Sequence, residues 1–164
     1  MSKGRQKQSI RDTARYIAPM RPVMVSNLPA GRDKWLLEPK LDGYRVIAVK
    51  SGGRADLYSM DGKLYNGEFS QIREALQKLS HQDVVLDGEI VAVEPSGRTN
   101  FNALQNRRST KLPIYYIVFD CLHFEERDPL DRAIEERKEA LAKLTADFLK
   151  PLQPIFEFVP EVEP

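Results

Sequence analysis

A lysine followed by an acidic turn and an arginine is the part of this 164-residue sequence best suited to chemistry, and it runs Glu38-Pro39-Lys40-Leu41-Asp42-Gly43-Tyr44-Arg45. A lysine is a nucleophile only as the neutral amine, so its pKa must be lowered by burial or by neighbouring cations. Lys40 follows the apolar run Trp35-Leu36-Leu37 and precedes Arg45, so we expect a buried approach and a nearby cation. Lys40 is therefore the candidate nucleophile.

The residues around Lys40 indicate what it would attack. A neutral amine forms a Schiff base with a carbonyl carbon or a phosphoramidate with phosphorus. Phosphorus is favoured, because the planar guanidinium of Arg45 matches phosphate oxygens. Glu38 and Glu89, the latter at the end of Val85-Leu86-Asp87-Gly88-Glu89, would hold a ribose hydroxyl, an adenine amino group or a divalent cation.

Two Asp-Gly pairs lie close to these residues in the sequence. Asp42-Gly43 is expected to turn the chain after Lys40, since glycine tolerates positive φ and Asp bonds its own backbone. The alternative is that this pair and Asp87-Gly88 are ordinary hairpin turns, with Lys40 a solvated amine. A Lys-x-Asp-Gly-x-Arg pattern would arise by chance in only roughly 0.002 of chains this long, which favours a functional motif.

The motif that begins at Lys40, followed by Leu86-Asp87-Gly88-Glu89, resembles the nucleotidyltransferase superfamily of ATP-dependent DNA ligases, RNA ligases and mRNA-capping enzymes. The resemblance implies that Lys40 takes AMP from ATP, with Mg²⁺ as the metal cofactor. It further implies that Glu38 reads the adenine and that Arg45 binds the ribose and phosphate. Glu89 would bind the ribose or the metal ion.

Two apolar residues complete the nucleotide site that the resemblance implies. The run from Tyr115 to Asp120 is similar to a later apolar strand of the family, whose aromatic residue, here Phe119, stacks on the base. Such stacking is worth on the order of 1 kcal/mol and needs no hydrogen-bond pattern, so packing in the core is the alternative for Phe119. Leu41, within the motif itself, would also contact the nucleotide.

Two further segments are most similar to bacterial DNA ligases of the end-joining type. They are Phe101 to Arg107 and the run that ends at Leu122, and the likeness extends from about Pro22 to about Leu149. It implies an ATP-dependent DNA ligase adenylation domain that acts in DNA repair on nicked double-stranded DNA, with repair proteins as further partners. An RNA ligase or guanylyltransferase, and a non-catalytic relative that binds nucleic acid, are the alternatives; the oligomeric state is open.

The sequence departs from the family pattern at two places. Ser59-Met60-Asp61-Gly62 puts a thioether where the family has the arginine of Ser-Arg-x-Gly, which helps to hold the nucleic acid. The later Glu-Gly and Lys-x-Lys motifs, for the metal and the α-phosphate, do not occur, because the last glycine is Gly97 and the last lysine is Lys150. We expect a C-terminally truncated, partial adenylation domain over residues 22–164, without the oligonucleotide-binding barrel, after a basic arm over residues 1–21.

The charge and hydrophobicity of the sequence limit which binding partners are expected. The chain carries 25 basic and 24 acidic side chains, so its net charge of +1 provides no global field for nucleic acid. The basic arm over residues 1–21 would follow phosphates or simply be solvated. No apolar run is long enough to span a bilayer and no signal sequence begins the chain, so we expect a cytoplasmic protein that does not bind membranes.

The few cysteine and histidine residues limit which metal ion the chain is expected to bind. Cys121 is the single cysteine, which excludes an internal disulfide and favours a position in the core. His81 and His123 lack the spacing of zinc ligands, so a zinc site is not expected. A bound metal should be magnesium, held by oxygen ligands and phosphate.

Hydrophobic periodicity and turn residues predict the elements that must position these side chains. The expected helices lie within residues 1–18, 69–79, 100–108, with Asn100 as the N-cap, and 134–149. The expected strands lie at 35–38, 44–50, 55–60, 63–65, 84–93, 114–124 and 154–159. The resulting fold class is α+β, with antiparallel sheets flanked by helices and the nucleotide between sheets. By the resemblance it is a partial, ATP-grasp-like nucleotidyltransferase domain.

Overall fold

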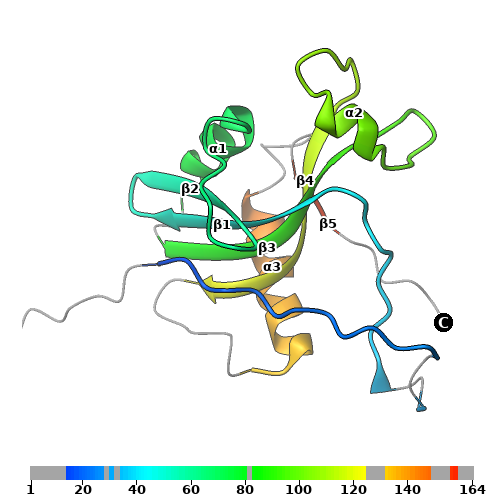
Figure 1. The fold of residues 1–164 in the computed structure, drawn as a ribbon. Coiled ribbons are helices and arrows are strands. Elements are labelled where there is room, and N and C mark those ends of the chain that lie inside the picture. Colours follow the sequence, from blue (N-terminus) through cyan, green and yellow to red (C-terminus); the bar gives the residue numbers. More distant parts are fainter. Residues whose placement is uncertain are drawn as a thin grey trace, which may run out of the picture.

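The computed structural model describes residues 14–27, 30–31, 34–80, 83–124, 132–148 and 156–158. They form one five-stranded sheet in the order β2-β1-β3-β4-β5, with three helices (Figure 1). The elements in chain order are β1 (Tyr44–Ser51), β2 (Arg54–Ser59), α1 (Ser70–Gln77), β3 (Asp83–Ala92), α2 (Phe101–Gln105), β4 (Ile114–Phe124), α3 (Ile134–Phe148) and β5 (Phe156–Phe158). All neighbouring strands pair antiparallel except β4 and β5, which are parallel.

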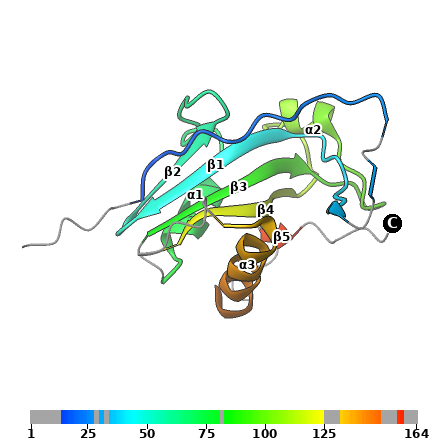
Figure 2. The same ribbon diagram turned by 90° about the horizontal axis from the view of Figure 1, so that it is seen from below.

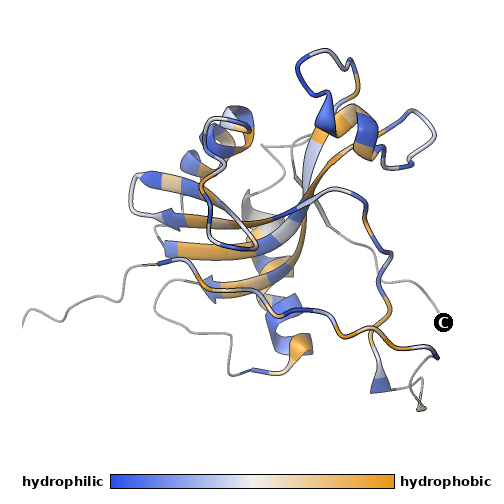
Figure 3. Ribbon diagram, in the orientation of Figure 1, coloured by the Kyte–Doolittle hydropathy of each residue, from blue (hydrophilic) through white to orange (hydrophobic). Residues whose placement is uncertain are grey.

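The two faces of the sheet carry separate groups of buried side chains. Successive side chains of a strand point to opposite faces, so Val46 and Ala48 of β1 join the larger core, whereas Ile47 and Val49 join a smaller one. Helices α1 and α3 lie on one side of the sheet, and the segment 14–27 runs along the other side (Figure 2). Apolar residues dominate β1, β3 and β4 in Figure 3, as expected for strands covered on both faces.

Strand β3 is the centre of the sheet, and one glycine in it makes the packing possible. The Tyr116 hydroxyl of β4 donates to the backbone oxygens of Val46 and Leu86, at 2.9 and 3.1 Å. The Tyr116 ring packs against Gly88. A Cβ added at Gly88 would lie 2.7 Å from this ring and 2.5 Å from the Ile117 backbone oxygen. Gly88 therefore lies inside a strand and is required by close packing, so the hairpin-turn interpretation of Asp87-Gly88 is wrong.

Most elements predicted from the sequence are confirmed within two residues at each end. The Asn100 cap is also confirmed, because its side chain accepts from the Ala103 amide at 2.9 Å, although the helix ends at Gln105. The predicted α+β class, with antiparallel strands flanked by helices, is confirmed, although the described residues contain a single sheet instead of several. At 63–65 only an isolated bridge between Leu64 and Tyr58 forms.

Two further predicted elements are wrong. Residues 35–38 form no strand, because no strand of the described residues pairs with them, and Trp35 in this stretch is 54% exposed. Residues 14–18 form no helix, while residues 1–13 of that predicted helix lie outside the described residues. Tertiary contacts hold the segment instead: the Ala14 amide donates to the Asp83 carboxylate at 3.2 Å, and the Tyr16 hydroxyl donates to a backbone oxygen of the β2 turn at 2.9 Å.

Replacing Gly88 should test the packing of the central strand. Gly88→Ala would push β3 and β4 apart and is expected to lower the free energy of unfolding by about 1 to 3 kcal/mol, the usual cost of overpacking a core. Gly53→Ala is the matched control, since a Cβ there meets nothing within 4 Å. Urea denaturation of both variants measures the difference, and equal stabilities would contradict the close approach.

Candidate functional site

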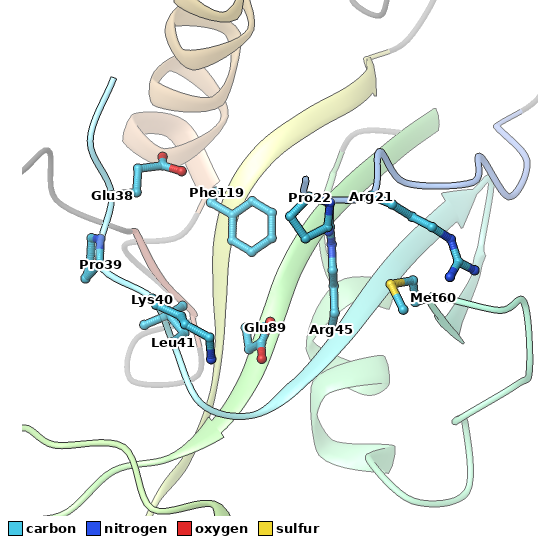
Figure 4. Close-up of a pocket in the computed structure, with 10 residues that line it drawn as sticks. All are labelled: Arg21, Pro22, Glu38, Pro39, Lys40, Leu41, Arg45, Met60, Glu89 and Phe119. Atoms are coloured by element: carbon cyan, nitrogen blue, oxygen red, sulfur yellow. The ribbon is translucent and has the colours of Figure 1, made fainter. Parts of the chain in front are cut away.

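A pocket of about 480 Å³ gathers all the site residues predicted from the sequence (Figure 4). It is lined by Arg21, Pro22, Glu38, Pro39, Lys40, Leu41, Arg45, Met60, Glu89 and Phe119. The predicted six, namely Lys40, Glu38, Leu41, Arg45, Glu89 and Phe119, come from the loop before β1 and from three neighbouring strands. Sequence reasoning did not place Arg21 or Pro22 here, because only the tertiary path of the segment 14–27 brings them to the sheet.

Arg45 is fixed by a buried carboxylate. Its Nε and Nη2 donate to the two oxygens of Asp87 at 3.1 and 2.8 Å, and Asp87 is only 3% exposed. Burial raises the pKa of Asp87, and the hydrogen bonds from Arg45 oppose that rise. The same contact raises the pKa of Arg45, so the guanidinium keeps its proton. The guanidinium carbon of Arg45 also lies 5.5 Å from the centre of the Phe119 ring. The contacts with Asp87 and Phe119 together fix the orientation of Arg45 in the wall of the pocket.

Glu89 connects the pocket to the turn after the candidate nucleophile. Its Oε1 accepts from the Gly43 amide at 3.0 Å. Burial raises the pKa of Glu89, while the Gly43 hydrogen bond and the charges of Arg45 and Lys40 act to lower it. Asp87 and Glu89 point to the same face of β3, as their spacing in the sequence predicts.

Gly43 is required for a different reason from the one expected. It is not among the glycines with positive φ, which are Gly31, Gly52, Gly62 and Gly97 in the described residues. A Cβ at Gly43 would instead lie 2.1 Å from the Ile90 oxygen and 3.0 Å from the Glu89 side chain. The glycine lets the loop approach β3 closely, which places Lys40 beside Glu89.

Lys40 is exposed, so the expected burial of its approach is wrong. The apolar run before it lies in an open loop, with Trp35 54% and Leu36 39% exposed. The amine is nevertheless directed to the pocket, next to Glu89 and near Arg45 (Figure 4). A ligand entering from solvent can therefore reach the Lys40 amine without displacing any part of the chain that the structure describes.

Glu38 and Phe119 form the other end of the pocket, and both contact helix α3. Lys138 donates from Nζ to the Glu38 carboxylate and to the Phe119 backbone oxygen. Phe119 is half-buried, lines the pocket and belongs to neither group of buried core residues. Packing in the core therefore does not account for its ring.

The described residues offer no preformed metal cage. Within the described ranges, no three or more His, Cys, Asp or Glu side chains cluster in a way that would hold an ion. Cys121 is buried, as expected, and burial raises the pKa of its thiol to about 12, which makes it unreactive. None of the described helices has the length and apolar character needed to cross a bilayer.

This fold and pocket define a nucleotidyltransferase domain of the ligase class. Residues 19–161 match the family model described as the ATP dependent DNA ligase domain, and the chain belongs to that family. The chain is 35% identical over 131 residues to the multifunctional non-homologous end joining protein LigD of Pseudomonas aeruginosa, covering 79% of this chain and 15% of that protein. It is 37% identical over 112 residues to LigD of Mycolicibacterium smegmatis, covering 68% of this chain and 14% of that protein.

Solved structures agree with the fold. The ligase domain of Mycobacterium tuberculosis LigD matches with a TM-score of 0.66 at 28% identity, over 77% of this chain and 39% of that one. A mycobacterial DNA ligase D complexed with ATP and MES matches with a TM-score of 0.64 at 27% identity, over 77% of this chain and 40% of that one. The chain thus spans less than half of each of these relatives.

Removing the charge of Glu89 should change how stability depends on pH. Burial raises the Glu89 pKa, so its stabilising contribution is full below about pH 4, where glutamates of the unfolded chain titrate, and is lost as pH rises through the folded pKa. Glu89→Gln should therefore raise the free energy of unfolding at neutral pH, and this gain should shrink toward about pH 4. Glutamine keeps an oxygen for the Gly43 amide.

Urea denaturation across this pH range measures the effect. Glu74→Gln is the matched control, because Glu74 is exposed on α1 and its side chain makes no hydrogen bond or ion pair with another described residue. A Glu89→Gln variant that is less stable than the parent at neutral pH would contradict the expected cost of burying this carboxylate.

Proposed function

We propose that this chain is the adenylating part of an ATP-dependent DNA ligase, in which Lys40 attacks the α-phosphate of ATP. The Lys40 nitrogen loses a proton and forms a bond to phosphorus, while the bond from that phosphorus to the bridging oxygen of the β-phosphate breaks and pyrophosphate leaves. The product is a lysyl-AMP phosphoramidate. The observation that carries the proposal is the pocket itself, which joins an accessible Lys40 to two carboxylates, an arginine and an aromatic ring.

The geometry supports a division of the pocket into two ends. Glu38 and Phe119 suit the adenine, because a carboxylate accepts from an amino group and a half-buried ring offers a stacking surface. Arg45 lies near Lys40 and suits the ribose and phosphate. With Nε and Nη2 committed to Asp87, Arg45 would bind ligand through its remaining donors. Leu41 would contact the nucleotide from the loop.

Glu89 is the residue that would hold Mg²⁺ or the ribose. Magnesium is bound by one or two carboxylates together with substrate phosphate oxygens, so a single pocket carboxylate beside the phosphate position fits this ion. When bound, the ion offsets negative charge that develops on the phosphates. Glu89 itself orients the loop through the Gly43 amide in either case.

The acceptor is proposed to be the 5′-phosphate at a nick in double-stranded DNA. The relatives named above are end-joining and DNA ligase proteins, which favours DNA over an RNA ligase or guanylyltransferase role. In this scheme AMP passes from Lys40 to the 5′-phosphate, and the 3′-hydroxyl then displaces AMP. Binding to repair proteins and a cytoplasmic location remain predictions that rest on the resemblance.

Labelling with ATP that is radioactive at the α-phosphate should test the first step. The parent chain with Mg²⁺ should retain label covalently, and Lys40→Ala should retain none, because it lacks the attacking nitrogen. Lys34→Ala is the matched control: Lys34 precedes the same loop but does not line the pocket, so its label should be unchanged. The Lys-x-Lys and Glu-Gly motifs do not occur in this sequence, so labelling should be slow. The absence of each group is expected to raise the activation barrier by about 3 kcal/mol. Label that persists in Lys40→Ala, or an unlabelled parent chain after hours, would contradict the proposal.

A chase with nucleic acid should identify the acceptor. Labelled protein mixed with nicked, 5′-phosphorylated DNA should transfer AMP to the DNA 5′ end, whereas the same nick in RNA should receive much less. Gel separation of protein, DNA and RNA follows the label. Preferential transfer to RNA would favour the RNA ligase alternative.

A further inference from the structure

Lys138, on α3, makes a contact that none of the expected site roles includes. Its Nζ donates to Oε1 of Glu38, and also to the Phe119 backbone oxygen at 2.7 Å. These two pocket residues come from separate parts of the fold, since Glu38 lies in the loop before β1 and Phe119 lies in β4. One ammonium group therefore joins two walls of the pocket.

The loop that carries Lys40 has few other connections to the domain. Between residues 36–42 and the other described residues, the Glu38–Lys138 pair is the one hydrogen bond or ion pair present. Just after this stretch, the Gly43 amide donates to Glu89 at 3.0 Å. Lys40 thus lies between two anchoring contacts, one made by α3 and the other by β3.

Helix α3 gives Lys138 a rigid base. The preceding residue, Arg137, donates to both oxygens of Asp120 at 2.8 and 3.0 Å in a buried ion pair. Further along the helix, Leu141 and Leu144 are buried in the larger core. The side chains of Lys138 and Glu38 are only 19% and 32% exposed, so their ion pair is screened less than one on the open surface.

We infer that Lys138 is a positioning residue, which orients the Glu38 carboxylate and holds the loop that presents Lys40. The inference rests on the proposed function and deepens it. Because Lys138 holds the carboxylate through Oε1, the second oxygen of Glu38 makes no contact with Lys138 and can accept from a ligand donor such as the amino group of adenine. Lys138 therefore acts through Glu38 and determines preference for a base that carries an amino group.

Nucleotide binding by three variants tests this role. Lys138→Met should weaken ATP binding about tenfold or more, which corresponds to about 1.4 kcal/mol, and Lys138→Arg should restore most of the loss. Lys143→Met is the matched control, because Lys143 is an exposed lysine of the same helix whose side chain makes no hydrogen bond or ion pair with other described residues. Calorimetric titration with ATP and with ITP, which has a carbonyl in place of the amino group, measures affinity and base preference. The preference for ATP over ITP should fall in Lys138→Met.

A double-mutant cycle separates positioning from general loosening of the helix. In a Glu38→Gln background the partner charge is gone, so Lys138→Met should add little further loss. If Lys138 served only to dock α3, the two losses would simply add. Urea denaturation of each variant confirms that the comparison is made on folded protein.

The single tryptophan provides a measurement that needs no nucleotide. Trp35 lies three residues before Glu38 and is 54% exposed. Releasing the loop in Lys138→Met should lower the fluorescence anisotropy of Trp35 and change its quenching by acrylamide, whereas Lys143→Met should leave both unchanged.

The outcomes distinguish this inference from the proposed function. Additive losses in the cycle, or an unchanged ATP preference together with unchanged Trp35 fluorescence, would overturn the role of Lys138. A parent chain that binds no ATP would overturn the proposed function, and the Trp35 measurement would still decide whether Lys138 anchors the loop.

Discussion

Two buried carboxylates at paired positions of the central strands are the constraint on which the rest of this structure depends. Asp87 of β3 lies opposite Asp120 of β4, and each is held by two hydrogen bonds from one arginine. Arg45 comes from β1 and Arg137 from α3. A buried carboxylate that loses its partner is strongly destabilising, so β1 and α3 must both stay in place. The packing of the sheet and the walls of the pocket are therefore determined by the same contacts.

This arrangement explains why α3 contributes to the site as well as covering the sheet. The Arg137 contact sets the position of the first turns of the helix, and Lys138 follows it directly. The pocket thus receives contacts from elements that are separate in the sequence, and their distances depend on one docked helix. Charged groups placed in advance in this way need little reorganisation when a ligand binds, which is how electrostatic stabilisation becomes effective.

The sequence predicts the parts of this fold and site that depend on local patterns. Alternating and continuous runs of apolar residues predict β1, β3 and β4. A short motif predicts Lys40 and Arg45 as site residues, because both lie in the loop before β1 or at the start of β1. The strand predicted at 35–38 is wrong, since an apolar run that remains exposed has the same local pattern as a buried strand. Nothing local could reveal the contact between Glu38 and Lys138, whose partners are 100 residues apart.

The motif glycines show why a correct expectation can rest on the wrong physical reason. Turn chemistry predicts the glycine at position 43, and the hairpin alternative places a second turn at Gly88, yet both glycines are needed because another backbone comes too close for a Cβ. Close approach at Gly43 brings the Lys40 loop onto Glu89, and close approach at Gly88 lets the Tyr116 ring lie against β3. Each close approach lies beside a carboxylate whose pKa is raised by burial, Glu89 at Gly43 and Asp87 at Gly88. Glu89 lines the pocket, and Asp87 holds Arg45, which lines it too. The cost of burying these two carboxylates therefore falls at the wall of the pocket.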